Sequence, residues 1–398
     1  MVAEELTTLF NRNGHQAHHY FALGTYDDSS RIPIYSYRSV AARLFRMIHR
    51  LSKVAGLPEI IPIELIFLLY RRRIFQYDII HFHDICSAIS PLTIAFISAL
   101  KPTVWTFHDC SPFTGGCLYP MDCKRYRKKC GQCPQLGAWP INTRVDLTSV
   151  MQAVKKHVIN EHDVTITTPS EWMAGMSLDV RPANFNPIVI PNGVNTEQYR
   201  LADKMTVRKK HGIPLDRFVV LIIATFLDDE RKGIKYAFEA LMKIKSLNPY
   251  LLLIGNINNS FEQMFKDFDF KSTGYIRGDK DKAEYFSASD IFLFTSLADN
   301  MPLVILETMA TGTPTVGFRT GGVPEMVQHN QSGYLVNPKD VDSLSEGLFL
   351  AYDKTVLQKW GYNARQEVEK KYNYNILYKN HLKLYIEKVN DFAKKRCG

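Results

Sequence analysis

Short apolar runs that alternate with helical patterns are the feature that most constrains the fold of this chain. In the first half, five runs rich in β-branched and aromatic residues predict strands: HQAHHYFAL, YDIIHFHDI, PTVWTFHD, DVTITTPS and NPIVIPNG. The second half repeats the scheme with FVVLIIATF, YLLLIG, STGYIRG, DIFLFTS, TPTVGF and GYLV. Alternation of this kind predicts parallel sheets covered by helices. We therefore expect an α/β protein with two doubly wound halves, a cleft between them, and ligands at the carboxyl ends of strands.

The start of the first half departs from this scheme. A doubly wound domain opens with a strand that turns into its first helix. Here VAEELTTLFNRNGH already has a helical pattern. We therefore expect the first strand of this domain to be missing from the sequence, through a misplaced start, a trimmed chain or a degenerate domain.

The seven cysteines indicate a reducing compartment. MVAEELTTLF is acidic and helical in pattern and does not resemble a signal peptide. An odd number of thiols then favours a cytoplasmic protein. Four of the thiols are spaced C-x5-C-x6-C-x2-C, and the final C-x2-C is a common half of a zinc site. The candidate ligands are Cys117, Cys123, Cys130 and Cys133. Structural zinc is one interpretation, and free thiols or disulfides are the other. The flanking KRYRKK should lower the thiol pKa values and favour metal binding.

Much of the net charge of +9 is local. Nine Lys or Arg and two Glu lie between Arg31 and Arg73. Within this region, VAARLFRMIHRLSKV predicts a helix with an apolar stripe from Val40 to Val54. A basic stripe of Arg43, Arg46, Arg50 and Lys53 lies beside it. An anionic membrane surface or a nucleic acid fits such a patch; a helix docked on its own domain with a solvated basic edge is the alternative. The most apolar run, IIPIELIFLLY, is too short to span a bilayer.

The segment LADNMPLVILETMATGTPTVGFRTGGVPEMV contains the best candidate site. Pro302 can open a helix, and the N–H groups of Met301, Leu303 and Val304 would suit a phosphate. Asp299 and Glu307 could accept hydrogen bonds from sugar hydroxyls. A helix-terminal acid and a solvated Glu would explain the same two residues without any function.

This segment resembles the donor-binding signature of the family 4 glycosyltransferases, a retaining family with the GT-B fold. The pattern has an acid, seven residues and a Glu, then xMAxGxPVV and a GGxxE turn. The chain also contains PIVIPNGVNTEQY, RKG at 231–233 and TPSEW at 168–172 in the expected order. The resemblance covers almost the whole chain. It departs from the pattern at Asp299, where the family usually has Glu, and at Thr225 or Phe226, where relatives often have Arg.

The resemblance implies a role for each candidate residue. Glu307 would hold ribose hydroxyls, and Asp299 hydroxyls of the transferred sugar. Lys232 would neutralise the donor diphosphate, with Arg231 as a substitute for the absent Arg or a solvated neighbour. Ile276 would border the base, and Asn300 would lie in the donor-binding turn. His108, after the strand TVWTF, would orient a donor hydroxyl as a catalytic residue. We expect His81 and His83 to pack within the sheet and Asp109 to fix the loop.

The resemblance also implies the organisation of the whole enzyme. An acceptor-side domain would cover residues 1–195, and a donor-binding domain residues 196–374, with a helix at about 375–396 packing back on the first domain. The expected activity is a hexosyltransferase in surface polysaccharide synthesis, such as capsule or exopolysaccharide, that resembles colanic-acid and capsule-type enzymes with a four-Cys loop. A UDP- or GDP-sugar would be the donor, and a glycan or lipid-diphosphate-linked sugar the acceptor.

No catalytic metal is expected, because four thiolates would leave zinc no open position. The enzyme would work in the cytoplasm or peripherally on the inner membrane face. A sugar-nucleotide epimerase or phosphorylase of the same fold is the alternative enzyme. A basic zinc-knuckle protein that binds nucleic acid is the alternative from another class, and the donor signature argues against it.

Overall fold

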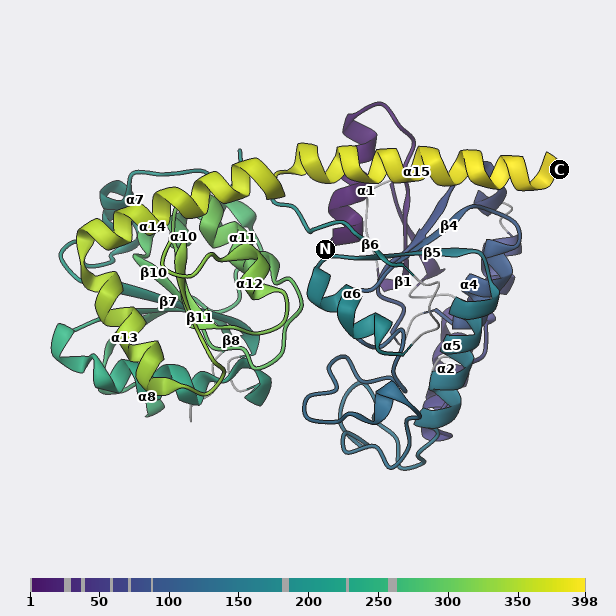
Figure 1. The fold of residues 1–398 in the computed structure, drawn as a ribbon, viewed down its shortest axis with the longest axis horizontal. Helices are drawn as coiled ribbons and strands as arrows, with labels where there is room; N and C mark the ends of the chain where they lie inside the picture. Colours follow the sequence, from purple (N-terminus) through teal and green to yellow (C-terminus); the bar gives the residue numbers. More distant parts are fainter. Residues whose placement is uncertain are drawn as a thin grey trace. The chain divides into compact units, whose positions relative to one another are not determined.

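The structure is a computed structural model that describes residues 2–24, 30–36, 40–57, 60–70, 73–86, 89–180, 186–226, 229–256 and 263–397. The chain forms two compact units. The first comprises Met1–Ile190 together with Tyr378–Gly398, and the second comprises Pro191–Leu377. Figure 1 shows the elements of both units.

The strands of the first unit form two separate parallel sheets. The two-stranded sheet pairs β1 (His19–Gly24) with β2 (Arg31–Ser36). The four-stranded sheet has the order β3-β4-β5-β6. Its strands are β3 (Ile80–Phe82), β4 (Thr103–Thr106), β5 (Val164–Thr168) and β6 (Ile188–Val189). Within the described residues, β1 and β3 are therefore both edge strands.

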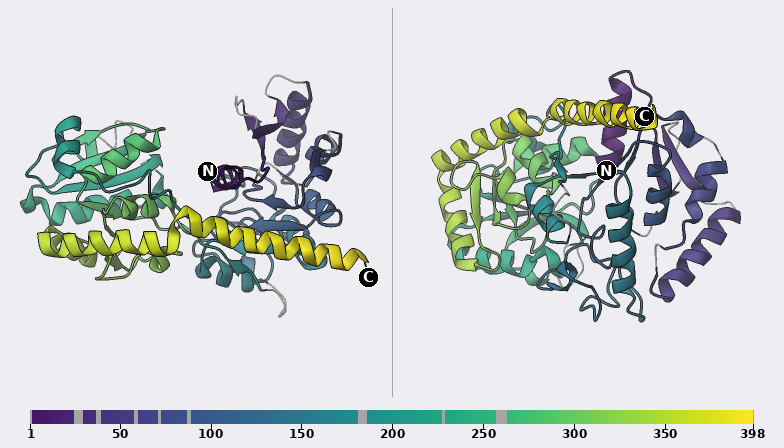
Figure 2. Two further views of the ribbon diagram at one scale, coloured as in Figure 1. Left: turned by 90° about the horizontal axis from the view of Figure 1, so that it is seen from above. Right: turned by 45° about the vertical axis from the view of Figure 1, so that its right-hand side comes forward.

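The helices of the first unit lie between these strands in sequence. They are α1 (Val2–Arg12), α2 (Val40–Val54), α3 (Ile63–Tyr70), α4 (Pro91–Ser98), α5 (Thr148–Glu161) and α6 (Glu171–Leu178), with 3-10 turns η1 (Arg73–Gln76) and η2 (Arg125–Arg127). The last helix, α15 (Tyr374–Cys397), begins in the second unit and continues into the first. It is the yellow helix that ends at the C label in Figure 2.

The second unit has one parallel sheet of the order β12-β11-β10-β7-β8-β9. Its strands are β7 (Val219–Phe226), β8 (Tyr250–Asn256), β9 (Asp269–Ser272), β10 (Ile291–Phe294), β11 (Thr315–Phe318) and β12 (Gly333–Val336). The chain winds outward in both directions from the adjacent strands β7 and β10. Such an arrangement opens a crevice at the carboxyl ends of the two central strands.

Helices cover both faces of this sheet. They are α7 (Lys204–His211), α8 (Ile234–Lys243), α10 (Asp279–Ala288), α11 (Leu303–Ala310), α12 (Val323–Met326), α13 (Val341–Tyr352) and α14 (Lys354–Glu367), with short turns η3 (Glu230–Lys232), η4 (Lys245–Leu247) and η5 (Val368–Tyr372). Alternate residues of β7 enter two cores. Val219 and Leu221 pack with α10 and α11, whereas Val220 and Ile222 pack with α8 and α13. Burial on both faces explains why β7 is a continuous apolar run.

The core of the first unit surrounds its four-stranded sheet. Trp105 of β4 and Phe107 are fully buried and pack with residues of α4 and α5. Ser90 and Ser170 cap α4 and α6, because their side chains accept hydrogen bonds from the N–H groups of Leu92 and Met173. The TPSEW motif thus places a helix start directly after β5.

The two parallel-sheet halves predicted from the sequence are confirmed, with two differences in detail. β2 was not among the predicted strands, because RIPIYS is short and contains a proline. The predicted strand STGYIRG was wrong beyond Ser272, where β9 ends. Gly274 has a positive φ of 68° that ends the extended run, so Ile276 lies in the segment between β9 and α10.

Candidate active site

The candidate donor site of the second unit is built at the carboxyl ends of β7 and β10. After β7 the chain turns through η3, which carries Arg231 and Lys232. After β10 it passes through Asp299 and enters α11. The two loops meet, because Leu297 N donates to Arg231 O at 2.8 Å and Thr295 Oγ1 donates to Lys232 O at 3.0 Å.

Two glycines permit this close approach of backbones. Gly233 has φ of 63°, and a Cβ there would collide with the carbonyl of Thr295. Gly321 has φ of 57°, and a Cβ there would collide with the carbonyl of Asp299. Gly322 N then donates to Asn300 O at 2.7 Å. The Gly-Gly pair therefore holds the loop that carries Asp299 in place.

Lys232 and Asp299 form an ion pair, with 3.0 Å between Nζ and Oδ2. Both side chains are mostly buried. Arg231 is directed elsewhere: its guanidinium lies 3.4 Å from Asp229 Oδ2 and donates to Ala298 O at 3.3 Å. Of these two basic residues, Lys232 is thus the one placed against the predicted sugar-binding acid. The side chains at 225 and 226, where relatives often have Arg, lie outside the described residues.

Glu307 is buried on α11, in contrast to the alternative interpretation of a solvated acid. Its Oε1 lies 3.9 Å from Lys282 Nζ of α10. Lys282 also pairs with Asp279 at 2.6 Å, and its ammonium lies 5.8 Å from the centre of the Tyr199 ring. Sequence analysis missed Lys282. In the sequence, Lys282 follows Asp279 by three residues on a predicted helix, and this spacing indicates only a local ion pair.

The remaining donor-site candidates surround the start of α11. Met301 is buried, and its carbonyl accepts a hydrogen bond from Asn192 at 3.0 Å. Leu303 and Val304 form the first turn of α11 and pack against the core below it, as Ile276 does from the segment before α10. Asn300 is buried in the loop between Asp299 and α11. The eight donor-binding candidates therefore belong to one unit and to neighbouring elements.

His108 belongs to the first unit, where it follows β4. Its Nε2 hydrogen-bonds His83 Nδ1 at 2.9 Å, and the two rings are stacked with centroids 5.2 Å apart. His81 of β3 hydrogen-bonds Tyr385 of α15 and Thr106 of β4. Burial lowers the pKa values of His81, His83 and His108, so these imidazoles are neutral at neutral pH.

Asp109 closes the turn that follows His108. Its Oδ1 accepts a hydrogen bond from Ser111 N at 2.7 Å. Burial raises the pKa of Asp109 to about 6. The nearby Lys155 ammonium is itself buried and donates to Ser111 O at 3.0 Å. These contacts fix the backbone that carries His108.

The cysteine loop is attached to α5 and to Asp146, which lies just ahead of that helix. Cys130 N donates to Gln152 Oε1, and Cys133 N donates to Asp146 Oδ2, both at 2.7 Å. Gln152 also donates to Tyr126 O at 2.6 Å. The four thiols of Cys117, Cys123, Cys130 and Cys133 are free of disulfides. A search of the described residues finds no three His, Cys, Asp or Glu side chains grouped to hold a metal ion. The zinc site stays a prediction.

One argument for that zinc site was wrong. The basic flank was expected to lower the thiol pKa values, but burial raises the pKa of Cys117 to about 12 and also raises those of Cys130 and Cys133. Desolvation of the thiolate outweighs the flanking charges, most of which are exposed to solvent.

Comparison with known proteins decides the class of enzyme. The family model Glycosyltransferase Family 4 matches residues 1–198, and the model Glycosyl transferases group 1 matches residues 203–367. The chain is a glycosyltransferase. The prediction of a hexosyltransferase is confirmed at this level. The match to both models places the candidate donor residues in the group 1 region and His108 in the family 4 region.

Curated relatives of this glycosyltransferase are distant. An uncharacterized glycosyltransferase of Methanocaldococcus jannaschii is 25% identical over 332 residues, which cover 78% of this chain and 75% of the relative. A UDP-Gal:alpha-D-GlcNAc-diphosphoundecaprenol alpha-1,3-galactosyltransferase of Escherichia coli is 28% identical over 46% of this chain and 50% of the relative. Others are named for capsular polysaccharide, amylovoran and colanic acid biosynthesis. Several matches, such as the galactosyltransferase, span about half of the relative.

Solved structures show the same fold. Sucrose-phosphate synthase from Thermosynechococcus elongatus superposes with a TM-score of 0.71 at 18% identity, covering 96% of this chain and 91% of that one. HepE of Anabaena in complex with UDP gives a TM-score of 0.63 at 16% identity, covering 90% and 86%. The glycosyltransferase therefore has the predicted GT-B fold, with two Rossmann-like α/β units.

Proposed function

We propose that this glycosyltransferase moves a sugar from a nucleotide-sugar donor to a glycan or lipid-diphosphate-linked acceptor, with retention of α configuration, in surface polysaccharide biosynthesis. The observation that carries the proposal is the meeting of Lys232, Asp299 and the start of α11, with Glu307 buried on the same helix. One cation, two acids and the N–H groups at the start of a helix suit a donor that contains a diphosphate and two sugars.

In this proposal the residues divide the donor among them. Glu307 accepts hydrogen bonds from the ribose hydroxyls, with the ammonium of Lys282 beside its carboxylate. Lys232 exchanges part of its contact with Asp299 for the diphosphate oxygens. Negative charge grows on the leaving diphosphate in the transition state, and a fixed ammonium stabilises it. Asp299 then holds hydroxyls of the transferred sugar, and His108 is the residue that orients a donor hydroxyl.

Two relatives support this choice of donor and acceptor. HepE binds UDP in a solved complex, which supports a UDP-sugar, with a GDP-sugar as the other choice. The Escherichia coli relative is named for a diphosphoundecaprenol-linked substrate, which supports a lipid-linked acceptor. Such an acceptor lies at a membrane surface. We therefore propose that the enzyme works in the cytoplasm, peripherally on the anionic inner face of the membrane.

Two substitutions of Glu307 test the donor assignment. Glu307→Ala should abolish transfer without unfolding the protein, because the ribose loses its acceptor. Glu307→Gln should lose less, since one acceptor oxygen remains. The measurements are transfer with a panel of UDP-, GDP- and ADP-sugars, and thermal stabilisation by each donor, which reaches about 2.7 kcal/mol at 100 times its dissociation constant. Glu239→Ala, at an exposed position of α8, is the control. A folded Glu307→Ala protein with near-normal transfer would refute the assignment.

A further inference from the structure

Histidines follow two neighbouring strands of the first unit at the same edge of its sheet. His83 comes directly after β3, and His108 lies two residues after β4, which is parallel to β3. Side chains of a strand alternate between its two faces, so His81 and His83 share one face, whereas Phe82 points to the other. Phe82 is buried in the core of the unit. The sequence HFH and the parallel pairing therefore gather imidazoles on the face opposite that core.

The imidazoles of His83 and His108 are bonded directly to each other. The distance between His83 Nδ1 and His108 Nε2 is 2.9 Å, and the ring planes differ by 21°. Burial lowers the pKa values of both rings, so each is neutral at neutral pH and carries a single N–H. One ring therefore donates and the other accepts. If His108 donates through Nε2, its Nδ1 is an acceptor; if it accepts at Nε2, its Nδ1 is a donor. The partner at Nε2 thus decides what the second nitrogen of His108 offers.

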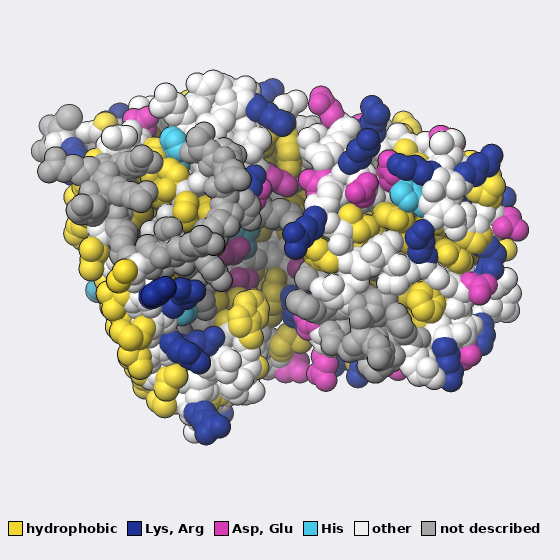
Figure 3. All heavy atoms as spheres, turned by 180° about the vertical axis from the view of Figure 1, so that it is seen from behind, with side chains coloured by type: hydrophobic (Ala, Val, Ile, Leu, Met, Phe, Trp, Pro, Cys, Tyr) yellow, Lys and Arg dark blue, Asp and Glu magenta, His cyan; other side chains and the backbone are white. Residues whose placement is uncertain are grey.

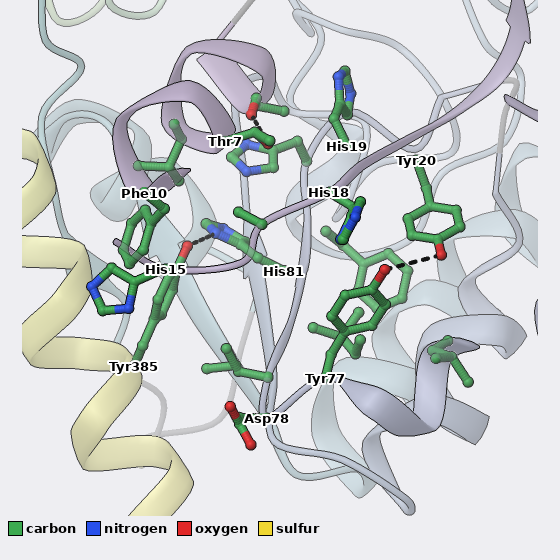
Figure 4. A pocket seen from close by; sticks show the side chains of 18 of the residues that line it. Thr7, Phe10, His15, His18, His19, Tyr20, Tyr77, Asp78, His81 and Tyr385 are labelled. Atoms are coloured by element: carbon green, nitrogen blue, oxygen red, sulfur yellow. Dashed lines mark hydrogen bonds between the residues drawn. The ribbon is translucent and has the colours of Figure 1, made fainter. Parts of the chain in front are cut away.

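His83 is itself held in place by the ring of His81. The centroids of these two rings are 4.1 Å apart. Both nitrogens of His81 are engaged: Nδ1 is bonded to the hydroxyl of Tyr385 of α15 at 2.5 Å (Figure 4), and Nε2 to Thr106 Oγ1 at 2.7 Å. The His81 ring therefore cannot turn without breaking two hydrogen bonds. His83 lies between this fixed ring and His108.

The three histidines also share a cavity of the first unit. His81, His83 and His108 line this cavity, which measures about 1000 Å³ and is drawn in Figure 4. A ring on a cavity wall lacks packing neighbours on its open side, so packing alone does not fix its orientation. Hydrogen bonds must then supply the order. For His108, the bond to His83 does so.

We propose that His83 is a positioning residue that fixes the orientation and the tautomer of His108. The inference rests on the proposed function, in which His108 orients a donor hydroxyl. That task needs a nitrogen of constant character, because a ring that flips or changes tautomer presents a donor in place of an acceptor. In this proposal His83 acts only through His108 and does not itself touch the donor.

Substitutions of His83 test the proposal by kinetics. His83→Asn should keep near-normal transfer, because the amide of Asn is attached to Cγ as Nδ1 is and can donate or accept there. His83→Leu cannot, and should lower kcat by roughly tenfold or more with little change in the KM for the donor, since a misplaced group at the reacting centre slows the chemical step. His83→Gln, whose amide lies one methylene further out, is the second variant and should lose transfer as His83→Leu does. His157→Leu, at an exposed position of α5, is the control and should keep full transfer. Thermal unfolding checks that each variant is folded.

Two further measurements show whether His83 acts through His108. In a His108→Ala background, His83→Leu should cause no further loss of transfer, because the residue that it positions is gone. Nitrogen NMR spectra of protein with isotope-labelled histidine report the tautomer of each ring, and the His108→Ala variant identifies the resonances of His108. The unsubstituted enzyme and His83→Asn should show His108 in one tautomer, whereas His83→Leu should show a mixture of two.

The outcomes separate this inference from the proposed function. Losses that multiply when His83→Leu and His108→Ala are combined would show that His83 has a role of its own. A single unchanged tautomer of His108 in folded His83→Leu would show that another contact fixes the ring. Either result overturns the inference and leaves the proposed function standing. Full transfer by His108→Ala would instead overturn the role of His108 in the proposed function, and the inference with it.

Discussion

Lys232 is the residue on which the charge balance of the donor site depends. Its ammonium is paired with Asp299, 67 residues later in the chain, and both side chains are mostly removed from water. A partly buried acid without its cation would be costly, and so would a diphosphate without one. Arg231 is bound to Asp229 and to a carbonyl, so a replacement cation would have to break those contacts first.

Lys232→Ala should therefore reduce kcat/KM by at least ~100-fold, or about 2.7 kcal/mol of transition-state stabilisation. Steady-state kinetics with the identified donor gives the value, and thermal unfolding checks that the variant is folded. Lys235→Ala removes an exposed charge three residues away and should leave kcat/KM unchanged. A loss of tenfold or less for Lys232→Ala would mean that Arg231 or another cation carries the diphosphate.

At the scale of structural elements, the cysteine loop is ordered by residues that lie outside its C-x2-C half. Gln152 and Asp146 fix the backbone at Cys130 and Cys133, which orders the C-x2-C half. Burial keeps the thiols of Cys117, Cys130 and Cys133 protonated at neutral pH. A metal would have to displace those protons, so zinc occupancy should fall as the pH is lowered.

We predict close to one zinc per chain, removed only by strong chelation. Cys130→Ser and Cys133→Ser should release the metal and lower the melting temperature, because each removes a thiolate ligand. Cys86→Ser, outside the loop, is the control and should keep the metal. Metal analysis of protein purified under reducing conditions is the measurement. A metal-free result would refute the zinc site.

At the scale of the whole molecule, α2 is the element that could bind the enzyme to a membrane surface. Its own residues Phe45 and Ser52 are buried, whereas its apolar stripe is open to solvent. The exposed fractions of this stripe are 81% for Val40, 49% for Leu44, 54% for Met47, 62% for Leu51 and 68% for Val54. Figure 3 shows apolar and basic side chains side by side at the edge of the first unit. In the described residues no helix is long and apolar enough to cross a bilayer.

An exposed apolar stripe beside basic residues is the pattern of a helix that lies in a membrane interface. We predict that the enzyme sediments with anionic vesicles at low salt, since each basic residue near anionic lipid contributes about 1 kcal/mol. Added salt should release it, because the attraction is screened within a Debye length of about 10 Å at 0.1 M. Replacing Arg43, Arg46, Arg50 and Lys53 by Gln should abolish binding and slow transfer to lipid-linked acceptors, while sparing donor hydrolysis.

The matched control removes four charges from the second unit. It replaces Lys235, Lys243, Lys245 and Lys354, all exposed, by Gln and should leave sedimentation unchanged. Normal vesicle binding and normal elongation of lipid acceptors by the α2 variant would mean that the basic stripe is a solvated face. Equal loss of binding in both variants would mean that net charge matters and α2 does not.

The sequence by itself determined the local elements and the class of fold. Apolar runs such as that of β7 and the stripes of α2 depend on neighbours within a few residues, so periodicity predicts them. The segment around Asp299 and Glu307 placed the first acid in the turn ahead of a helix and the second on that helix. The strand β2 was missed, because a short run with a proline becomes a strand only when a partner such as β1 lies beside it.

The tertiary structure decided the contacts between residues distant in sequence. Only the folding of the loops after β7 and β10 against each other pairs Lys232 with Asp299, and only the packing of α10 on α11 places Lys282 near Glu307. The direction of the cysteine pKa shifts was also a matter of tertiary structure, because desolvation depends on what covers each thiol. The bond between His83 and His108 has the same origin: the two residues are 25 positions apart, and the parallel pairing of β3 with β4 brings them together.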